Sequence, residues 1–183
     1  LNRKAAEKGY SKAKNKLGLC YERGHGVDKN YAEALKWYTE SAEQGYKIAQ
    51  YNTGNMYYYG KGTEIDYNKA FDYYSRSAEK GYANAENMVG LCYELGRGVK
   101  EDLAEALKWY IKSAEQGYEI AQCNAGNMYY YGKGTEIDYN KAFDYYSRSA
   151  KEGNKRAENK LGLCYELGRG VEKDFTAAAK WYT

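Results

Sequence analysis

Apolar side chains recur at helical spacing in two kinds of segment along the whole chain. In residues 83–95, Ala85, Val89 and Cys92 lie at i, i+4 and i+7, which is one face of a helix. A second stripe follows in residues 103–115 and comprises Leu103, Ala106, Leu107, Tyr110 and Ala114. Helices of about 13 residues are marginal alone in water, so each stripe must pack against a neighbour. The pattern predicts an all-α protein built from pairs of helices.

This helix pair returns every 36 residues, without an insertion or a deletion. Each copy is opened by a glycine, counted here as place 1, and these are Gly9, Gly45, Gly81, Gly117 and Gly153. Repeats of this length are typical of solenoid proteins. We therefore expect residues 1–183 to form a single repeat array. It comprises the end of a preceding helix at 1–8, full repeats at 9–44, 45–80, 81–116 and 117–152, and a truncated fifth repeat at 153–183.

Capping residues mark the ends of the predicted helices. Gly96, at place 16, ends a first helix where a glycine can take the left-handed conformation. Asp102 precedes a second helix as its N-cap, and Glu105 has the spacing of a capping box. The N-cap residues of the other copies are Asn30, Asp66, Asp138 and Asp174.

A further glycine falls in the middle of each first helix, at place 10. These residues are Gly18, Gly54, Gly90, Gly126 and Gly162. A mid-helix glycine costs about 1 kcal/mol relative to alanine, so five of them must be compensated. We expect them to permit a close approach of the second helix, through its recurring alanines.

Odd and even copies differ systematically. Places 11–14 read Leu-Cys-Tyr-Glu in the odd copies and Asn-Met-Tyr-Tyr in the even ones. Residues 54–78 and 126–150 are identical, including residues of solvated type such as Lys61 and Asp72. The true repeat is therefore a pair of hairpins, and any surface alternates in chemistry with that period.

Composition and charge narrow the class of protein. The 28 Lys+Arg and 25 Asp+Glu residues give a net charge of +3, and their signs alternate along the chain. This distribution argues against a nucleic-acid partner. There is no apolar run long enough to insert into a membrane and no signal peptide at the start. Because the chain lacks an initiator Met, we expect a piece of a longer protein or a processed chain.

Residue sets for catalysis or for a cofactor are missing from the sequence. His25 is the one histidine and lies in a loop, and no metal-ligand cluster occurs. Residues 54–62 resemble a phosphate loop superficially, but the glycine spacing is wrong and no strand precedes them. We therefore expect no enzyme, no cofactor and no metal.

The four cysteines fall into two groups. Cys20, Cys92 and Cys164 share place 12, and alternate copies lie too far apart for a disulfide. We interpret these three as small buried hydrophobic residues, and Cys123 as an exposed thiol. This usage favours a reducing intracellular compartment.

The residues shared by the five copies resemble those of a known repeat family. The spacing A-x3-L-G-x2-Y-x2-G-x-G-V-x2-D-x3-A-x3-Y is clearest in residues 157–182. The other copies follow it with modest departures, such as Thr53 or Ala125 for Leu and Thr63 or Thr135 for Val. It resembles the Sel-one-like repeat, a class within the tetratricopeptide superfamily. The resemblance covers the whole chain and implies an all-α, right-handed superhelix of αα-hairpins (an α-solenoid). It also implies that the chain functions as a scaffold or adaptor that binds partner proteins or peptides.

In related superhelices the first helices line the concave groove, so we place the candidate peptide-binding residues there. Places 7, 11 and 14 lie together beside the core stripe. An asparagine ladder could clamp a peptide backbone and tyrosines could supply apolar area; alternatively, Asn merely tolerates a solvated helix face. The candidate residues are Asn15, Glu22, Asn55, Tyr58, Asn87, Glu94, Asn127, Tyr130, Asn159 and Glu166.

Two other functions stay open. The ends of the array lack polar capping repeats, so the chain could be a structural segment that self-associates head to tail or joins a larger complex. An RNA-binding helical repeat would need a stronger basic groove. The cations at place 17 have acids nearby, so we expect a solvated role at the helix ends; they are His25, Lys61, Arg97, Lys133 and Arg169.

Overall fold

The computed structural model describes residues 2–182, and side chains from residue 5 onward. Throughout that range the regular structure is α-helical, as the sequence predicts. Leu1 and Thr183, which the sequence assigns to the ends of the array, lie outside the described residues. The chain divides into two compact units, residues 1–100 and 101–183, and each is described by itself. No helix in the described range is long and apolar enough to cross a membrane.

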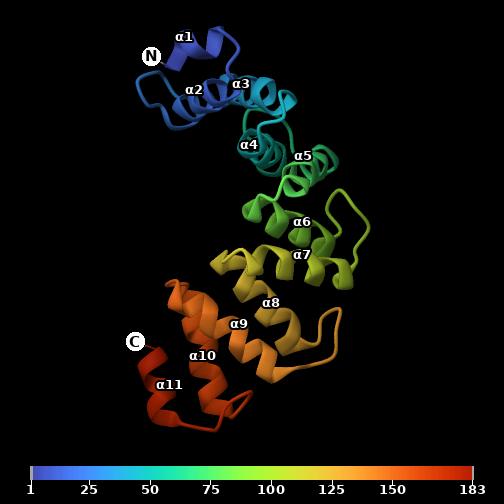
Figure 1. Ribbon diagram of the computed structural model, residues 1–183, viewed down its shortest axis with the longest axis vertical. Helices are drawn as coiled ribbons and strands as arrows, with labels where there is room; N and C mark the ends of the chain where they lie inside the picture. The colour runs from blue at the N-terminus through green and yellow to red at the C-terminus, as the bar shows by residue number, and fades with distance from the viewer. Residues whose placement is uncertain (1, 183) are drawn as a thin grey trace. The chain divides into compact units, whose positions relative to one another are not determined.

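The first unit contains five full helices after a short one (Figure 1). Its helices are α1 (Asn2–Glu7), α2 (Ser11–Arg23), α3 (Tyr31–Glu43), α4 (Lys47–Tyr59), α5 (Tyr67–Glu79) and α6 (Ala83–Leu95). Helices that follow each other in sequence pack against each other, so α2 with α3 and α4 with α5 form hairpins. This arrangement buries the two apolar stripes that the sequence pattern predicts.

The second unit repeats the same arrangement (Figure 1). Its helices are α7 (Leu103–Glu115), α8 (Glu119–Tyr131), α9 (Tyr139–Lys151), α10 (Lys155–Leu167) and α11 (Phe175–Trp181). Helices α8 and α9 form one hairpin and α10 and α11 form the next. Every first helix begins at place 3 and ends at place 15, as the sequence predicts.

The predicted caps of these helices are present. Asp66 accepts a hydrogen bond from the backbone N–H of Lys69 at 3.0 Å, and Asn30 accepts one from Glu33 at 3.0 Å. Gly60 follows α4 with φ of +65°, the left-handed conformation that glycine adopts without strain. Each cap supplies partners for backbone groups that a helix end leaves unpaired.

The glycine in the middle of each first helix makes room for an aromatic ring. A Cβ atom on Gly54 would lie 2.6 Å from Cδ1 of Tyr74, and one on Gly126 would lie 2.7 Å from Cδ1 of Tyr146. The prediction that alanines approach this glycine is therefore wrong. The second helix does come close, but it does so with the tyrosine at place 30, which needs the space that a side chain at place 10 would fill. This tyrosine is fully buried in the first four copies, whereas Tyr182 of the fifth is 47% exposed.

A buried serine, which the sequence analysis did not single out, also joins the two helices of each hairpin. Ser77 is fully buried, and its hydroxyl donates to the backbone carbonyl of Lys47 at 2.7 Å. Ser149 donates to the carbonyl of Glu119 at 2.6 Å in the second unit. These carbonyls lie at the start of the first helix, so the serine fixes how the two helices of a hairpin are aligned.

Candidate interaction surface on the first helices

The predicted peptide-binding residues of the first unit are engaged in contacts between helices. Glu22 accepts a hydrogen bond from the hydroxyl of Tyr38 at 2.8 Å and forms an ion pair with Lys61 at 3.1 Å. Asn55 accepts a hydrogen bond from the hydroxyl of Tyr74 at 2.8 Å. Both acceptors therefore satisfy a tyrosine hydroxyl that burial removes from water.

Tyr58 is the even-copy counterpart of Glu22 and is 5% exposed. The guanidinium of Arg97 donates to its hydroxyl at 2.5 Å and lies 5.3 Å from the centre of its ring. Arg97 also lies 5.0 Å from the ring centre of Tyr67, which meets Tyr58 edge to face. This cation–π arrangement joins one hairpin to the next.

The second unit has the same contacts. Asn127 accepts from the hydroxyl of Tyr146 at 2.9 Å, and Glu166 accepts from that of Tyr182 at 2.7 Å. Tyr130 is 3% exposed and accepts from Arg169 at 2.6 Å. The place-17 cations Lys61, Arg97 and Arg169 thus contact the preceding hairpin. They lie just past helix ends and remain partly exposed, in line with the predicted solvated role, and the loop in addition brings them against that hairpin.

The other predicted binding residues are distributed between interior and surface. Asn15 is 8% exposed and accepts a hydrogen bond from Asn52 at 2.9 Å. Asn87 is 6% exposed, Glu94 is half-buried, and Asn159 is exposed. The ten predicted residues therefore do not share one open surface, and Asn55 and Asn127 are the two that continue onto the face described next.

The most exposed stripe of the first helices lies beside the predicted positions, at places 4, 8, 11 and 15. We call this set the open stripe. In α4 it comprises Ile48, Asn52, Asn55 and Tyr59, and in α8 it comprises Ile120, Asn124, Asn127 and Tyr131. Tyr59 is 56% exposed and Tyr131 is 51% exposed, whereas the intervening positions of these helices are mostly buried. The two even-copy stripes are identical in residue type.

The odd copies give the open stripe a different chemistry. It comprises Lys12, Lys16, Leu19 and Arg23 in α2, Asn84, Met88, Leu91 and Leu95 in α6, and Arg156, Lys160, Leu163 and Leu167 in α10. In α6 the stripe is not open along its whole length, because Met88 is only 7% exposed. Lys160 lies against the neighbouring even stripe, since its ammonium donates to the Tyr131 hydroxyl at 2.7 Å. Cationic and amide–aromatic stripes are therefore adjacent within a unit.

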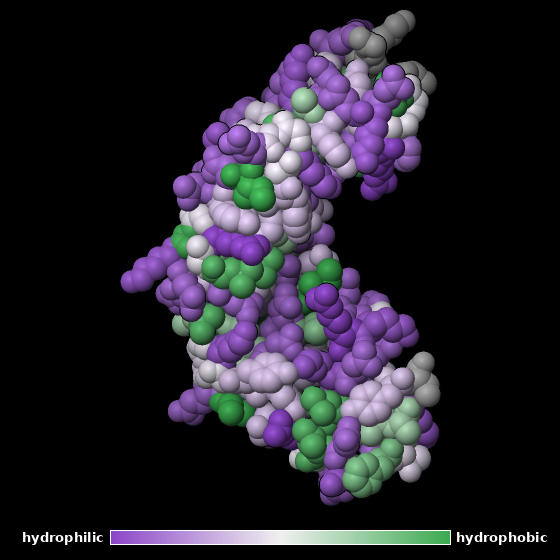
Figure 2. Space-filling model, turned by 180° about the vertical axis from the view of Figure 1, so that it is seen from behind, coloured by the Kyte–Doolittle hydropathy of each residue, from purple (hydrophilic) through white to green (hydrophobic). Residues whose placement is uncertain are grey.

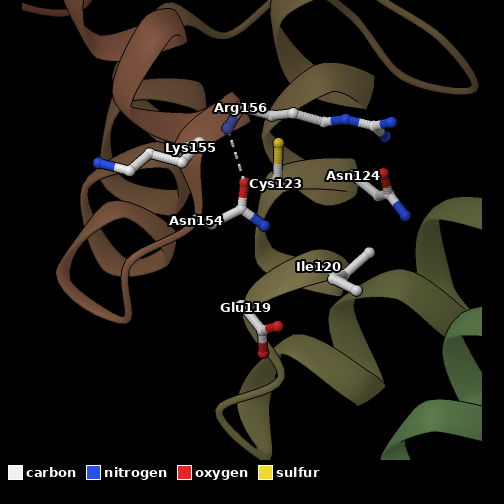
Figure 3. A pocket seen from close by; sticks show the side chains of 7 residues that line it. All are labelled: Glu119, Ile120, Cys123, Asn124, Asn154, Lys155 and Arg156. Atoms are coloured by element: carbon white, nitrogen blue, oxygen red, sulfur yellow. Dashed lines mark hydrogen bonds between the residues drawn. The ribbon is translucent and has the colours of Figure 1, made fainter. Parts of the chain in front are cut away.

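A hollow of about 370 Å³ opens between the first turns of α8 and α10 (Figure 3). It is lined by Glu119, Ile120, Cys123, Asn124, Asn154, Lys155 and Arg156. In Figure 3 the side chain of Arg156 extends toward Asn124, whereas that of Lys155 points away from it. The lining of the hollow therefore includes the apolar side chain of Ile120, the guanidinium of Arg156 and the amide of Asn124.

Cys123, the lone cysteine of place 7, borders this hollow but is only 3% exposed. The prediction of an exposed thiol is therefore wrong, because α10 covers this face of α8. Burial raises the pKa of the Cys123 thiol, although Lys160 and Arg156 lower it somewhat. A buried thiol of raised pKa is a poor nucleophile. Cys92 and Cys164 are buried, as predicted, whereas Cys20, for which burial was also predicted, is only partly buried. All four cysteines are free.

A second hollow, of about 420 Å³, lies over α8 and α9, where the rings of Tyr129 and Tyr145 stack at 5.9 Å. Its cations are already neutralised, since Lys141 pairs with Asp138 at 3.4 Å and Arg148 with Glu115 at 3.1 Å. Tyr57 and Tyr73 stack in the same way in the first unit. We therefore interpret this aromatic pair as packing between the two helices of a hairpin and not as a ligand-binding surface.

Comparison with known proteins agrees with this hairpin architecture. The model of the Sel1 repeat family matches residues 11–46, 47–82, 83–118, 120–154 and 155–183. The chain belongs to the Sel1 repeat family. Sel1 repeat proteins are in general protein-interaction scaffolds, and the family is in general non-catalytic. A search of curated proteins gives no match.

Solved Sel1 structures show the same fold. The crystal structure of c5321, a protective antigen of uropathogenic Escherichia coli with an SLR fold, matches with a TM-score of 0.90 and 38% identity over 99% of this chain. A Sel1 repeat protein from Oxalobacter formigenes matches with a TM-score of 0.88 and 35% identity over 96% of this chain. This chain spans 39% of the length of the first and 72% of the second.

The open stripe is the part of the Sel1 hairpin that sequence reasoning missed. Places 7 and 14 point about 100° away, around the helix axis, from places 8 and 15. A shift of one residue in sequence therefore moves a side chain from the face that packs on other helices to the open stripe. One signal was present: place 15 is apolar in Tyr59, Leu95, Tyr131 and Leu167, although it ends the helix beside a loop. Among described residues no cluster of side chains could hold a metal ion.

Proposed function

We propose that this Sel1 repeat chain is a non-enzymatic scaffold that binds an extended segment of a partner protein along the open stripe of its first helices. One observation carries the proposal. The two even stripes leave a tyrosine about half-exposed, at Tyr59 and Tyr131, beside an amide and an isoleucine, while the rest of each helix is used in packing. Exposed aromatic side chains are enriched in protein interfaces.

The chemistry of the stripe suits an extended peptide. The amide oxygens of Asn55 and Asn127 accept from tyrosine hydroxyls, so it is their N–H groups that can donate to the carbonyls of a peptide backbone. The isoleucine and tyrosine offer apolar area for the side chains of the peptide. The hollow beside Ile120 has the size of a pocket for a side chain of the partner. On the face drawn in Figure 2, hydrophobic side chains form small separate groups among hydrophilic ones.

Selection of random peptides displayed on phage against the immobilised chain tests the proposal. Truncation of an interface tyrosine commonly costs more than 1 kcal/mol, so we expect the double variant Tyr59→Ala/Tyr131→Ala to weaken the selected peptides about tenfold or more. The matched control is Ile65→Ala/Ile137→Ala, which removes two side chains that are also duplicated and are each 56% exposed. Equal losses in both double variants, or none in the first, would refute binding at the stripe.

A further inference from the structure

The charged residues of the open stripes are all of one sign. The chain as a whole carries nearly equal numbers of basic and acidic residues, 28 and 25. The open stripes of the five first helices nevertheless contain no aspartate or glutamate, and their charged residues are all basic: Lys12, Lys16, Arg23, Arg156 and Lys160. A merely solvated face would carry both signs, as the remainder of the chain does.

These cations are also not neutralised by acids. Within residues 5–182 no ion pair involves Lys12, Lys16, Arg23 or Arg156. Their sequence neighbours off the stripe do have acidic partners: Lys14 pairs with Glu40 at 2.9 Å and Lys155 with Glu158 at 2.8 Å. The acids near the stripe are engaged elsewhere, as Glu22 is with Lys61 and Tyr38. The stripe therefore keeps a positive potential of its own.

Each unit brings this charge next to an even stripe. In the first unit α2 carries Lys12, Lys16 and Arg23, and α2 touches α4 through the hydrogen bond from Asn52 to Asn15. In the second unit α10 carries Arg156 and Lys160, and both α10 and α8 line the hollow in Figure 3. Both units thus offer an amide–aromatic stripe flanked by unneutralised cations.

Resting on the proposed function, we infer that the bound segment is acidic: an extended peptide whose Glu or Asp side chains meet the cationic stripes and whose apolar side chains meet the isoleucine and tyrosine. Arginine can grip a carboxylate with two hydrogen bonds, and lysine provides a point charge. A nucleic acid is disfavoured as the occupant, because the ammonium of Lys160 covers one face of the Tyr131 ring at 5.0 Å. That contact leaves the ring a poor platform for a stacked base.

Three fluorescein-labelled peptides of matched design test this inference by fluorescence anisotropy. Each contains three copies of a four-residue unit, Glu-Tyr-Glu-Ser, Gln-Tyr-Gln-Ser or Lys-Tyr-Lys-Ser. We expect the Glu peptide to bind about tenfold or more tightly than the Gln peptide, with an affinity that falls as salt rises, and the Lys peptide to bind weakest. Equal affinity for the Glu and Gln peptides would overturn the inference, as would stronger binding of a labelled oligouridylate.

Charge-reversal variants locate the effect. Lys12→Glu/Lys16→Glu/Arg23→Glu in the first unit and Arg156→Glu/Lys160→Glu in the second should each weaken the Glu peptide, and their combination should weaken it about tenfold or more. The controls change the same net charge at exposed lysines off the stripe, as Lys29→Glu/Lys36→Glu/Lys100→Glu and Lys151→Glu/Lys173→Glu. They should stay within about twofold of the parent chain. Equal losses in stripe and control variants would show that only net charge matters.

The two proposals can fail separately. If phage-selected peptides depend on Tyr59 and Tyr131 but are not enriched in Glu and Asp, the stripe binds a partner and the acidic inference is wrong. If no selected peptide depends on these tyrosines, the proposed function itself is wrong. Circular dichroism of every variant confirms that a loss of binding is not a loss of fold.

Discussion

The ring of Tyr74 lies against Gly54, and its hydroxyl donates to Asn55. One tyrosine therefore determines two residues of the facing helix: a glycine that leaves room for the ring and an acceptor for the hydroxyl. In odd copies the acceptor moves to Glu22 or Glu166, but the hydroxyl is still paired. At the scale of single residues, the glycine at place 10 and the acceptor at place 11 or 14 follow from burying one phenol in each of the first four hairpins.

Substitution Gly54→Ala tests this interpretation. The added Cβ would lie 2.6 Å from the ring of Tyr74, which overpacks the hairpin by about 1–3 kcal/mol, while helix propensity returns about 1 kcal/mol. Because real Cβ atoms essentially never lie under 3.0 Å from another heavy atom, we expect the overpacking to outweigh the gain in helix propensity. The net loss should reach up to about 2 kcal/mol in the free energy of unfolding, measured in urea. The exposed change Asn68→Ala should stay within about 0.5 kcal/mol. An unchanged Gly54→Ala variant would contradict the close contact.

Alkaline pH tests the burial of the tyrosines at place 29, Tyr73 and Tyr145. Burial raises the pKa of Tyr73 to about 12, and it raises the pKa of Tyr145 to about 12. A raised pKa stabilises the fold below the unfolded value of 10.0, and this contribution is lost as pH rises toward 12. The variant Tyr73→Phe/Tyr145→Phe should therefore lose less stability than the parent between these values, as measured by urea unfolding. An identical alkaline slope would show that these tyrosines are not protected.

At the scale of elements, alternating contacts join successive hairpins. Glu22 of one hairpin meets Lys61 of the next, and Tyr58 of that hairpin meets Arg97 of the one after. Where place 14 is an acid, the next place 17 is lysine, and where it is tyrosine, the next is arginine. This pairing accounts for the period of two hairpins, because each junction type needs its own partner residues.

A double-mutant cycle on Tyr58→Phe and Arg97→Ala measures such a junction. Tyr58→Phe removes the hydrogen bond but keeps the ring, so the cycle reports the hydrogen bond alone and predicts a coupling free energy of about 0.5–1.5 kcal/mol by urea unfolding. Tyr130→Phe and Arg169→Ala repeat the measurement in the second unit and should agree. Additive results in both cycles would mean that these hydrogen bonds do not stabilise the junctions.

Helix positions, caps and the family were predictable from the sequence, because glycine, aspartate and apolar spacing act locally at Gly96, Asp102 and Ala85. The role of the place-10 glycine was not, since it depends on which side chain of another helix reaches it. The open stripe also needed the structure. Places 7 and 8 are neighbours in sequence, and only packing of the next hairpin decides that Cys123 is covered while Asn124 faces the hollow.

At the scale of the whole molecule, we propose that both units act as one array. Neighbouring repeats stabilise each other through their interfaces, so damage in one should be felt in the next. In a Trp37→Phe background the remaining tryptophans, Trp109 and Trp181, both report on residues 101–183. We expect Gly54→Ala, which lies in the other unit, to lower the urea midpoint of their fluorescence. An unshifted midpoint would mean that the two units unfold independently.

The central claim is that a partner segment lies along the open stripe. Nuclear magnetic resonance of the labelled chain, titrated with a phage-selected peptide, tests it most directly. The account predicts that the largest shifts fall on stripe residues such as Asn55, Tyr59, Asn127 and Tyr131, while Ile65 and Ile137 stay unmoved. Largest shifts on the second helices or on the loops, with the stripe unmoved, would contradict it.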